Sequence, residues 1–402
     1  MNKILIFTTA YWPFIGGAEI AVKEITDRLG GNNSQSYSFD LITSRLDKKL
    51  APKERVGNIN VFRLGGGRKF DKFLLPFNGL FLALKLNRLN EYDWAMSVMA
   101  SQAGITAALF KILKPKVKLL LNLQEGDEEE YLARYVFGSN FLFKLLIRPL
   151  SRLVVKKADY ITVISRYLQE RAKNGGARCP IEVIPNGVDV GKFKVSARGG
   201  SAFGGKSSYL KVIEFKKSLG LSENEKVIIT VSRLVKKNGV EDLIRAFSYL
   251  NDIDCYLFII GTGELQTELK KLTAELKLEK RIIFLGKIAH DQVPSYLTAS
   301  DVFVRSSLSE GLGNAFLEAM ATGVPVVGTP IGGIPDFLFD EETGLLCQAG
   351  NPADIAAKIR RLLDDTVLAE KIKANGLKLV QEKYDWSKIA ASYDGVFEKI
   401  VK

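Results

Sequence analysis

Short apolar runs alternate with longer amphipathic segments along most of the 402-residue chain. The runs are rich in Ile, Leu, Val and Phe, which is typical of strands buried on both faces of a parallel sheet. The segments between them have helical spacing, so the pattern predicts repeated parallel β-α-β units. The expected strands are residues 4–7, 39–43, 59–63, 94–98, 118–122, 160–164 and 181–184 in a first series, and 226–231, 255–260, 281–285, 301–304, 325–328 and 344–347 in a second.

The segment between the two series has a different composition. Residues 196–208 are rich in Gly, Ser and Lys, which favours a flexible linker or a mobile loop. The chain is therefore expected to be α/β, with domains at 1–188 and 223–385 joined by a linker at 189–222. Ligands of such open parallel sheets bind beyond the carboxyl ends of the strands.

Positive charge is concentrated in the first half of the chain. Residues 1–185 hold 28 Lys and Arg against 17 Asp and Glu, whereas the remainder holds 29 against 28. Two basic stretches, 70–88 and 141–157, also carry many Phe and Leu residues. Such helices can lie in an anionic membrane interface, or they can face the core with solvated lysines, and both interpretations stay open. No nucleic-acid motif accompanies the charge, so nucleic acid is not an expected partner.

The sequence lacks a long apolar run, and it has few cysteines and histidines, which bears on localisation and metal binding. No run reaches the roughly 18 apolar residues of a membrane-spanning helix, and the apolar start at 4–7 is too short for a signal peptide. Three scattered cysteines are typical of a reducing cytoplasm, so we expect a cytoplasmic protein, either free or peripheral at the inner face of the cell membrane. The single histidine, His290, is expected at the start of a surface helix and excludes both a Ser-His-Asp triad and a multi-histidine metal site. No metal and no cofactor are expected.

Residues 309–328 contain the most informative pattern, with Glu310 near the start and Glu318 eight residues later. Glu310 is expected on a loop after the strand 301–304, and Glu318 in the first turns of the following helix. Gly311 and Gly313 would let the backbone approach a ligand closely, and Asn314 is expected to cap the helix. A helix N-terminus attracts anions, and a carboxylate accepts hydrogen bonds from sugar hydroxyls. The combination predicts a nucleotide-sugar site.

The same segment closely resembles the signature of the family-4 retaining glycosyltransferases, the glycosyl transferases group 1, which have the GT-B fold. Residues 13–19 are similar to the Gly-Gly-x-Glu loop of that family, and residues 184–189 to its hinge motif. The resemblance implies two Rossmann-like domains facing each other across a cleft. It also implies that a last helix, at about residues 386–402, packs back on the first domain.

The resemblance further implies roles for individual residues in binding a nucleotide-diphosphate sugar. Glu310 is expected to bind hydroxyls of the donor sugar, and Glu318 to bind the ribose diol. Arg233 and Lys237 are expected to hold the diphosphate, and with Glu310 they form the expected catalytic set. The wider donor site is expected to include Gly16, Gly17, Asn238, Gly261, Ile288, Gly311, Leu312, Gly313 and Asn314.

Two positions depart from the family pattern. The commonest pattern has Lys where this chain has Asn238, so either Lys237 or Asn238 is expected as the second phosphate ligand. Many members have His where this chain has Gln124, which hydrogen-bonds a sugar hydroxyl but cannot titrate. The leaving phosphate is therefore expected to deprotonate the acceptor. Candidates for contacting the acceptor or the transferred sugar are Gln124, Glu125, Asp127 and Asn186, although residues 127–130 can equally be a solvated acidic helix start.

Together these features predict a retaining, metal-independent hexosyltransferase. The donor is expected to be a UDP- or GDP-sugar, and the acceptor a hydroxyl of a lipid-linked or saccharide molecule in the synthesis of cell-envelope polysaccharide or glycolipid. Two alternatives stay open: another GT-B nucleotide-sugar enzyme such as an epimerase, and a non-catalytic partner that binds a sugar nucleotide. The first glycine pair, Gly16-Gly17, lacks the Gly-x-Gly-x-x-Gly spacing of a dinucleotide site, which argues against a dehydrogenase.

Overall fold

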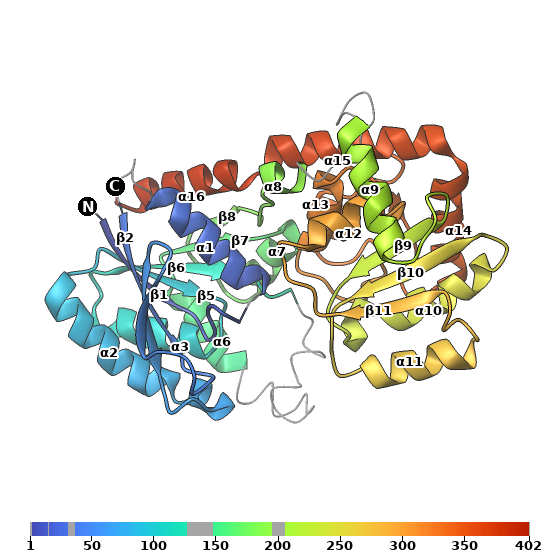
Figure 1. Ribbon diagram of the computed structural model, residues 1–402. Coiled ribbons are helices and arrows are strands. Elements are labelled where there is room, and N and C mark those ends of the chain that lie inside the picture. The colour runs from blue at the N-terminus through green and yellow to red at the C-terminus, as the bar shows by residue number, and fades with distance from the viewer. Residues whose placement is uncertain (1, 15, 31–36, 127–147, 195–205, 402) are drawn as a thin grey trace. The chain divides into compact units, whose positions relative to one another are not determined.

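The computed structural model describes residues 2–14, 16–30, 37–126, 148–194 and 206–401 (Figure 1). Contacts divide the chain into two compact units. Unit 1 comprises Met1–Asn186 and Trp386–Lys402, and unit 2 comprises Gly187–Asp385. Within the described ranges, no helix combines the length and the apolar character that crossing a membrane requires.

Unit 1 is built on an eight-stranded sheet with the order β3-β4-β2-β1-β5-β6-β7-β8. All neighbouring strands are parallel except β3 and β4, which form an antiparallel pair at one edge. The apolar runs of the sequence correspond to seven of the strands, and the charged edge strand β3 was not predicted. The strands are β1 (Asn2–Phe7), β2 (Tyr37–Ser44), β3 (Lys53–Val56), β4 (Ile59–Leu64), β5 (Trp94–Val98), β6 (Lys118–Leu123), β7 (Tyr160–Val163) and β8 (Ile181–Val183).

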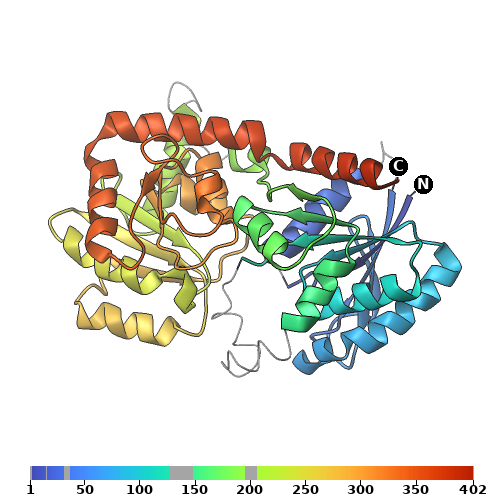
Figure 2. The same cartoon turned by 180° about the vertical axis from the view of Figure 1, so that it is seen from behind.

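Helices cover both faces of this sheet, which explains why its central strands are apolar throughout (Figures 1 and 2). Alternate side chains of β1 point to opposite faces: Ile4 and Ile6 pack with α1 and α16, whereas Leu5 and Phe7 pack with α2 and α3. The first and last helices of the chain thus lie side by side on one face. The helical segments are α1 (Gly17–Leu29), η1 (Lys69–Phe73), α2 (Leu75–Asn90), α3 (Gln102–Leu113), α6 (Arg148–Lys157), α7 (Arg166–Asn174) and α16 (Trp386–Val401).

Unit 2 is built on a six-stranded, entirely parallel sheet with the order β11-β10-β9-β12-β13-β14. Within this sheet the chain forms β9 first, then β10 and β11 on one side of β9, and then β12 on its other side. The carboxyl ends of β9 and β12 therefore flank a topological switch point, where sheets of this kind bind ligands. The strands are β9 (Lys226–Val231), β10 (Cys255–Ile260), β11 (Ile282–Gly286), β12 (Val302–Arg305), β13 (Val326–Gly328) and β14 (Leu345–Leu346).

One face of the second sheet packs against α10, α11, α14 and the start of α15 in a single apolar core. On the other face, Phe303 of β12 packs edge-on against Phe316 of α13, which in turn contacts Phe337. The helical segments of this unit are α8 (Val190–Lys194), α9 (Lys206–Ser218), η4 (Lys236–Asn238), α10 (Val240–Phe247), η5 (Ser248–Leu250), α11 (Gln266–Glu275), α12 (Val293–Thr298), α13 (Asn314–Ala321), η6 (Ile334–Asp336), α14 (Pro352–Asp364) and α15 (Thr366–Lys383).

The predicted linker, 189–222, contains two helices, so the expectation of a flexible segment is wrong for α8 and α9. Phe215 of α9 packs edge-on against Tyr296 of α12, with the ring centroids 4.9 Å apart. Nζ of the buried Lys216 donates hydrogen bonds to the carbonyls of Glu223 and Glu225, at 3.3 and 2.8 Å. These contacts of Phe215 and Lys216 hold α9 on unit 2. Most of the Gly- and Ser-rich stretch, residues 195–205, lies outside the described residues.

Candidate functional site

The loops that follow β9 and β12 are joined by backbone hydrogen bonds at the switch point of unit 2. The carbonyl of Lys237 accepts hydrogen bonds from the backbone N–H groups of Leu308 and Ser309, at 2.7 and 3.2 Å. The Ser306 hydroxyl donates to the carbonyl of Gly239 at 2.7 Å. The two predicted donor-binding segments are therefore parts of one structure.

Two glycines make this close approach of the loops feasible. Gly239 has φ 62°, and a Cβ built on it would lie 1.9 Å from the carbonyl oxygen of Ser306. Gly332 has φ 60°, and its Cβ would lie 1.8 Å from the carbonyl oxygen of Glu310. Only glycine fits either position, because a side chain would overlap backbone and the left-handed conformation disfavours other residues. Gly332 thereby supports the loop that carries Glu310.

Glu310 is nine-tenths buried, and its carboxylate is held from two sides. Oε1 accepts a hydrogen bond from the backbone N–H of Gly311 at 3.1 Å. Oε2 lies 2.5 Å from an Nη of Arg305, at the end of β12, but without the alignment of a hydrogen bond. The carboxylate is thus fixed by the backbone of Gly311 on one side and by an ion pair with Arg305 on the other. Arg305 was missed by sequence reasoning, and its place at the end of an apolar strand was the available signal.

Asn238, at the end of η4, links Arg233 and Arg305 through hydrogen bonds of its side chain. Its Nδ2 donates to the carbonyl of Arg233 at 2.6 Å, and its Oδ1 accepts from Arg305 at 3.2 Å. The side chain is almost fully buried, at 2% exposure. Its oxygen and one amide hydrogen are thus used within the protein, which argues against Asn238 as the second phosphate ligand. Lys237 is buried beside it, whereas the side chain of Arg233 is exposed.

Glu318 lies on the second turn of α13 and contacts the single histidine of the chain. Nε2 of His290 is 2.9 Å from Oε1 of Glu318. The imidazole also lies edge-on to Phe193 of α8, at a centroid distance of 6.0 Å. His290 was expected only at the start of a surface helix, and the structure places it on the carboxylate expected to bind the ribose.

The start of α13 differs from expectation in one respect. Gly313, with φ 97°, occupies the N-cap position, and no side chain caps the helix there. Asn314 is the first helical residue, so the expectation that it caps the helix is wrong. Gly313, in the left-handed conformation, ends the loop instead. The N-terminus of α13 therefore lies next to Gly311 and Leu312.

Two further predicted donor residues of unit 2, Gly261 and Ile288, lie just beyond the adjacent strands β10 and β11. The backbone N–H of Gly261 donates to the carbonyl of Gly286 at 2.7 Å, joining the ends of β10 and β11. This bond commits the Gly261 amide within the sheet. Ile288, two residues beyond β11, is partly buried.

In unit 1, the glycine pair lies at the start of α1. Gly16 is the extended N-cap residue and Gly17 is the first helical residue, and both are exposed. The carboxylate of Glu19 lies close by, since a Cβ built on Gly16 would be 2.7 Å from its Oε2. An acidic side chain in the first turn is ordinary for a helix start.

Gln124 belongs to a buried polar network in unit 1. Its Nε2 donates to Oδ1 of Asn122 at 2.9 Å and to Oδ1 of Asn186 at 3.0 Å, and its Oε1 accepts from Asn186 at 2.7 Å. Asn122 in turn donates to Thr162 and to the hydroxyl of Tyr393 on α16, at 3.0 and 2.6 Å. Both amide hydrogens of Gln124 are thus used inside the unit, so donating to a sugar would require breaking this network. Glu125 lines a nearby cavity, and Asp127 lies outside the described residues.

Among the described residues, no group of three or more His, Cys, Asp or Glu side chains is placed to hold a metal ion. The chain does contain one Asp-x-Asp triplet, Asp252-Ile253-Asp254, which the sequence reasoning overlooked. It lies before β10, at the opposite end of the strand from the switch point. Both carboxylate oxygens of Asp252 accept hydrogen bonds from Arg360 at 2.7 Å, and this pairing lowers the pKa of Asp252 to about 2.

Two family models match successive parts of the chain. Residues 15–192 match the model described as Glycosyltransferase Family 4. Residues 211–379 match the model described as Glycosyl transferases group 1. Between them they cover most of both units, including the Glu310 loop and the glycine pair at 16–17.

Proteins with similar sequences along their full length include two with assigned activities. The chain is 27% identical to N-acetyl-alpha-D-glucosaminyl L-malate synthase of Bacillus anthracis, covering 100% of this chain and 98% of that protein. It is 29% identical to the GDP-mannose-dependent alpha-(1-6)-phosphatidylinositol monomannoside mannosyltransferase of Mycobacterium tuberculosis, covering 97% of both.

The fold is similar to that of solved GT-B structures. Sucrose-phosphate synthase from Thermosynechococcus elongatus superposes with a TM-score of 0.82 at 19% identity, covering 100% of this chain and 99% of that one. The expectations of a GT-B fold and of family membership are thus confirmed. The chain belongs to the family-4 glycosyltransferases, the glycosyl transferases group 1, and is a glycosyltransferase of the GT-B type.

Proposed function

We propose that this glycosyltransferase moves a hexosyl unit from a nucleotide-diphosphate sugar, with a uridine or guanosine base, to a hydroxyl of its acceptor. The observation that carries the proposal is the position of Glu310 at the switch point of unit 2, where Gly311 and Arg305 hold its carboxylate. A carboxylate held in this way is suited to accept a hydrogen bond from a sugar hydroxyl. The ion pair with Arg305 fixes the carboxylate in position.

The diphosphate would be held by cations and backbone amides near Glu310. Arg233 follows β9 and is exposed, and the N-terminus of α13 adds its dipole. Negative charge grows on the leaving diphosphate as the bond to the sugar breaks, so preorganised cations stabilise that state more than the ground state. Lys237 is the better candidate for the second ligand, because the amide of Asn238 is already occupied. Glu318, with His290 against it, would bind the ribose diol.

Proton removal from the acceptor is assigned to the leaving phosphate. The only histidine contacts Glu318, so no histidine is available as a general base for the acceptor hydroxyl. A phosphate oxygen on the same face of the sugar can accept the proton, which gives retention of the anomeric configuration. On this account Arg233→Ala reduces turnover far more than Gln124→Ala, and equal losses would refute the phosphate's role.

The function is tested first by finding the donor. A thermal-shift screen of UDP-, GDP- and ADP-sugars should give a rise of a few degrees with at least one donor at saturation. The donor that binds is then incubated with and without candidate acceptors, with and without EDTA, and the anomer formed is determined by NMR. Product that appears without any acceptor would identify an epimerase, and binding without turnover would identify a non-catalytic partner. Loss of activity with EDTA would contradict a metal-independent reaction.

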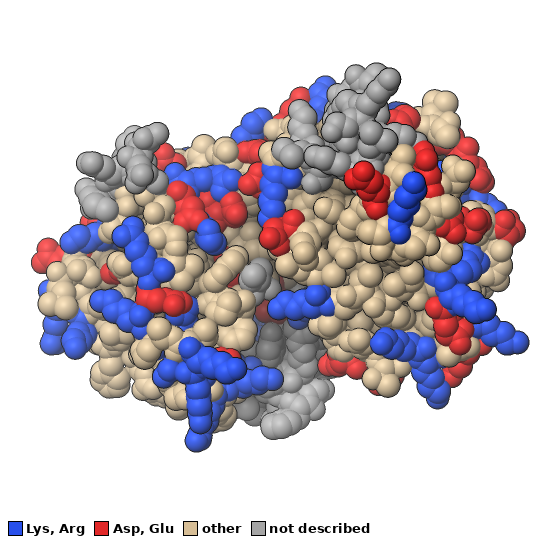
Figure 3. All heavy atoms as spheres, viewed as in Figure 1, with Lys and Arg blue, Asp and Glu red and all other residues tan. Residues whose placement is uncertain are grey.

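We also propose that unit 1 docks on an anionic membrane through one side of η1 and α2. The residues Phe70, Phe73, Leu74, Phe77 and Phe81, named here the α2 stripe, are spaced by one, three or four positions and are 42% to 72% exposed. Basic side chains lie before, within and after the stripe along the chain: Arg68, Lys69, Lys72, Lys85 and Arg88. In Figure 3, Lys and Arg side chains gather at the lower edge of unit 1, where η1 lies in Figure 1.

The apolar and basic side chains of this surface favour contact with an anionic lipid bilayer over exposure to water. Burying one Phe side chain contributes about 1.5–3 kcal/mol, and each nearby Lys or Arg adds about 1 kcal/mol at an anionic surface. The mycobacterial relative, by its name, acts on a phosphatidylinositol derivative, which is itself a lipid. An acceptor of that kind would lie in the membrane that the α2 stripe contacts.

Vesicle sedimentation tests the docking surface. The protein should bind phosphatidylcholine vesicles that contain phosphatidylglycerol, and bind pure phosphatidylcholine vesicles much less. Replacing two aromatic residues, Phe77→Ser with Phe81→Ser, should weaken binding more than tenfold, since two Phe side chains are worth several kcal/mol. Val367→Ser, at an equally exposed apolar position of unit 2, is the control. Equal binding by the double variant and the control would rule out the α2 stripe.

A further inference from the structure

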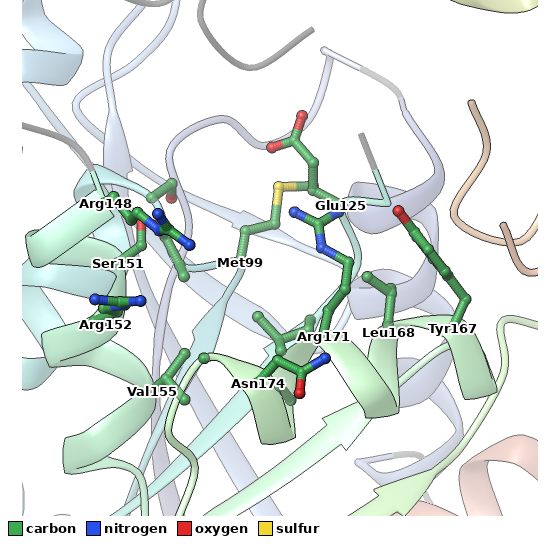
Figure 4. Close-up of a pocket in the computed structure, with 15 residues that line it drawn as sticks. Met99, Glu125, Arg148, Ser151, Arg152, Val155, Tyr167, Leu168, Arg171 and Asn174 are labelled. Atoms are coloured by element: carbon green, nitrogen blue, oxygen red, sulfur yellow. The ribbon is translucent and has the colours of Figure 1, made fainter. Parts of the chain in front are cut away.

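The cavity lined by Glu125 lies within unit 1, at the carboxyl ends of β5 and β6. It has a volume of about 400 Å³ and is enclosed by the loops after these two strands and by the helices α6 and α7. Figure 4 shows Arg148 and Arg152 of α6 on one side, Arg171 and Tyr167 of α7 on the other, and Glu125 at the upper margin. None of these residues belongs to the proposed donor site of unit 2.

Basic side chains predominate among the described residues that line the cavity. Three of these residues, Arg148, Arg152 and Arg171, carry guanidinium groups, and one, Glu125, carries a carboxylate. Arg152 has no ion-pair partner among the described residues, and its side chain is exposed. An anion bound between α6 and α7 would interact with guanidinium groups from both helices. The planar guanidinium also matches phosphate oxygens bidentately.

Hydroxyl and apolar groups complete the lining. The Ser101 and Ser151 side chains are partly buried at the cavity, and Tyr167 stacks against Arg171, whose guanidinium carbon lies 5.7 Å from the ring centroid. Met99, Leu123, Val155 and Leu168 make much of the remaining surface apolar. A ligand that fits has an anionic head and an uncharged body, and it is too large to be a simple ion alone.

The cavity lies at the edge of the sheet where the other candidate residues of unit 1 are found. Ser101 hydrogen-bonds through its hydroxyl with Thr9, which follows β1, at 2.9 Å. Glu125 follows directly on Gln124 at the end of β6. The loop after β1 also leads to Gly16 and the start of α1, so a ligand in the cavity would lie along the same edge as that glycine pair.

We propose that this cavity binds a phosphate group carried by the acceptor. The inference rests on the proposed function in one respect: the bound molecule is the acceptor only if the protein transfers a sugar. Two sources of such a phosphate have the same chemistry, a water-soluble phosphate ester and a phospholipid headgroup.

Titration calorimetry of inorganic phosphate into the full chain tests the site directly. We expect saturable binding that falls at least tenfold in Arg152→Gln and in Arg148→Gln, and that is partly retained in Arg152→Lys, which keeps the charge. Arg178→Gln, at an exposed arginine of the same unit that does not line the cavity, is the matched control. Arg233→Gln separates this cavity from the diphosphate site of unit 2.

Phosphate binding that survives Arg233→Gln and is lost in the two α6 variants places the anion site in unit 1. An absence of saturable binding, equal binding by the α6 variants, or loss only in Arg233→Gln would each overturn the proposal. Competition by glycerol 3-phosphate or by short-chain dihexanoyl phosphatidic acid then distinguishes the sources, and competition by neither also overturns it. Failure of the transferase proposal is detected separately, as the absence of any sugar-nucleotide donor.

Discussion

Glu310 and Glu318 differ in the side chains that hold them, and the difference predicts separate kinetic effects. Glu310 is fixed by Arg305 and Gly311, where it would contact the transferred sugar, whereas Glu318 contacts His290, where it would bind the ribose. A hydrogen bond to a charged group contributes about 1.5–3 kcal/mol, or roughly ten- to hundredfold. Glu310→Gln should therefore lower kcat by that factor, and Glu318→Gln should mainly raise the donor KM.

Steady-state kinetics with the donor found in the screen would measure both variants. Glu268→Gln, at an exposed glutamate of α11, should leave both constants unchanged. The assignment fails if Glu310→Gln changes only KM, or if the two variants have the same kinetic effect.

The three cysteines should react at very different rates in the native protein. Burial raises the pKa of the Cys347 thiol to about 12, and Cys255 is fully buried, whereas Cys179 is partly exposed. At pH 8 only about one Cys347 in ten thousand would be a thiolate, the reactive form. Iodoacetamide followed by mass spectrometry should therefore label Cys179 first, and label all three only after unfolding. Native labelling of Cys347 at the rate seen in denaturant would contradict the described packing.

At the residue scale, the sequence predicted candidate ligands, but it did not predict the side chains that contact them. Glu310 and Arg233 were predicted as ligands because each follows a strand in a segment that resembles the family, and their roles stay predictions. Arg305 and His290 were not predicted as site residues, because their contacts join strands and helices that are distant in the sequence. Asn238 was a candidate ligand because it stands where the family pattern has Lys, and only the fold shows its amide bridging Arg233 and Arg305.

At the scale of elements, the junction between the loops after β9 and β12 depends on Gly239. Gly220 has a similar left-handed φ of 78°, but nothing lies within 4 Å of a Cβ built on it, whereas Gly239 faces the carbonyl of Ser306. Alanine at Gly220 should cost about 1 kcal/mol of unfolding free energy from backbone strain alone. Gly239→Ala adds the overlap and should cost several kcal/mol in total. Chemical denaturation measures both, and equal losses would show that the junction has room for a side chain.

The buried network between β6 and α16 predicts a second effect on stability. Tyr393→Phe removes the hydroxyl that accepts a hydrogen bond from Asn122, and leaves a buried N–H group without a partner. An unsatisfied buried donor costs about 1–3 kcal/mol, which lowers Tm by roughly 2–10 °C for a unit of this size. Tyr249→Phe, whose ring is exposed, is the matched control. An unchanged Tm for Tyr393→Phe would contradict the role of this network in holding the last helix.

Elements with an apolar run or strong helical spacing were predictable, and elements defined by tertiary contacts were not. β9 and β10 were predicted with the bounds that the structure has, because they are buried on both faces. β3 carries charged residues on an exposed edge, so only its pairing with β4 makes it a strand. α9 adjoins a Gly- and Ser-rich stretch, and its packing against Tyr296 was not visible in the sequence.

At the scale of the whole molecule, the two units divide the charge unequally. The sheet of unit 2 holds the candidate donor site, and the first 185 residues hold nearly all of the net positive charge. The fold of both units followed from the alternation of strands and helices, which is a property of the entire chain. The acceptor could not be predicted in the same way, because its candidate cavity is assembled from β5, β6, α6 and α7 without a shared motif.

The central claim is that the carboxyl edge of the unit 2 sheet binds a nucleoside diphosphate through Arg233. Titration calorimetry of UDP and GDP into the wild-type chain and into Arg233→Gln tests it most directly, with Arg178→Gln as the charge-matched control. We predict saturable binding of at least one of the two nucleotides, weakened about ten- to hundredfold by Arg233→Gln and unchanged in the control. Binding of neither nucleotide, or equal binding by wild type and Arg233→Gln, would contradict the account.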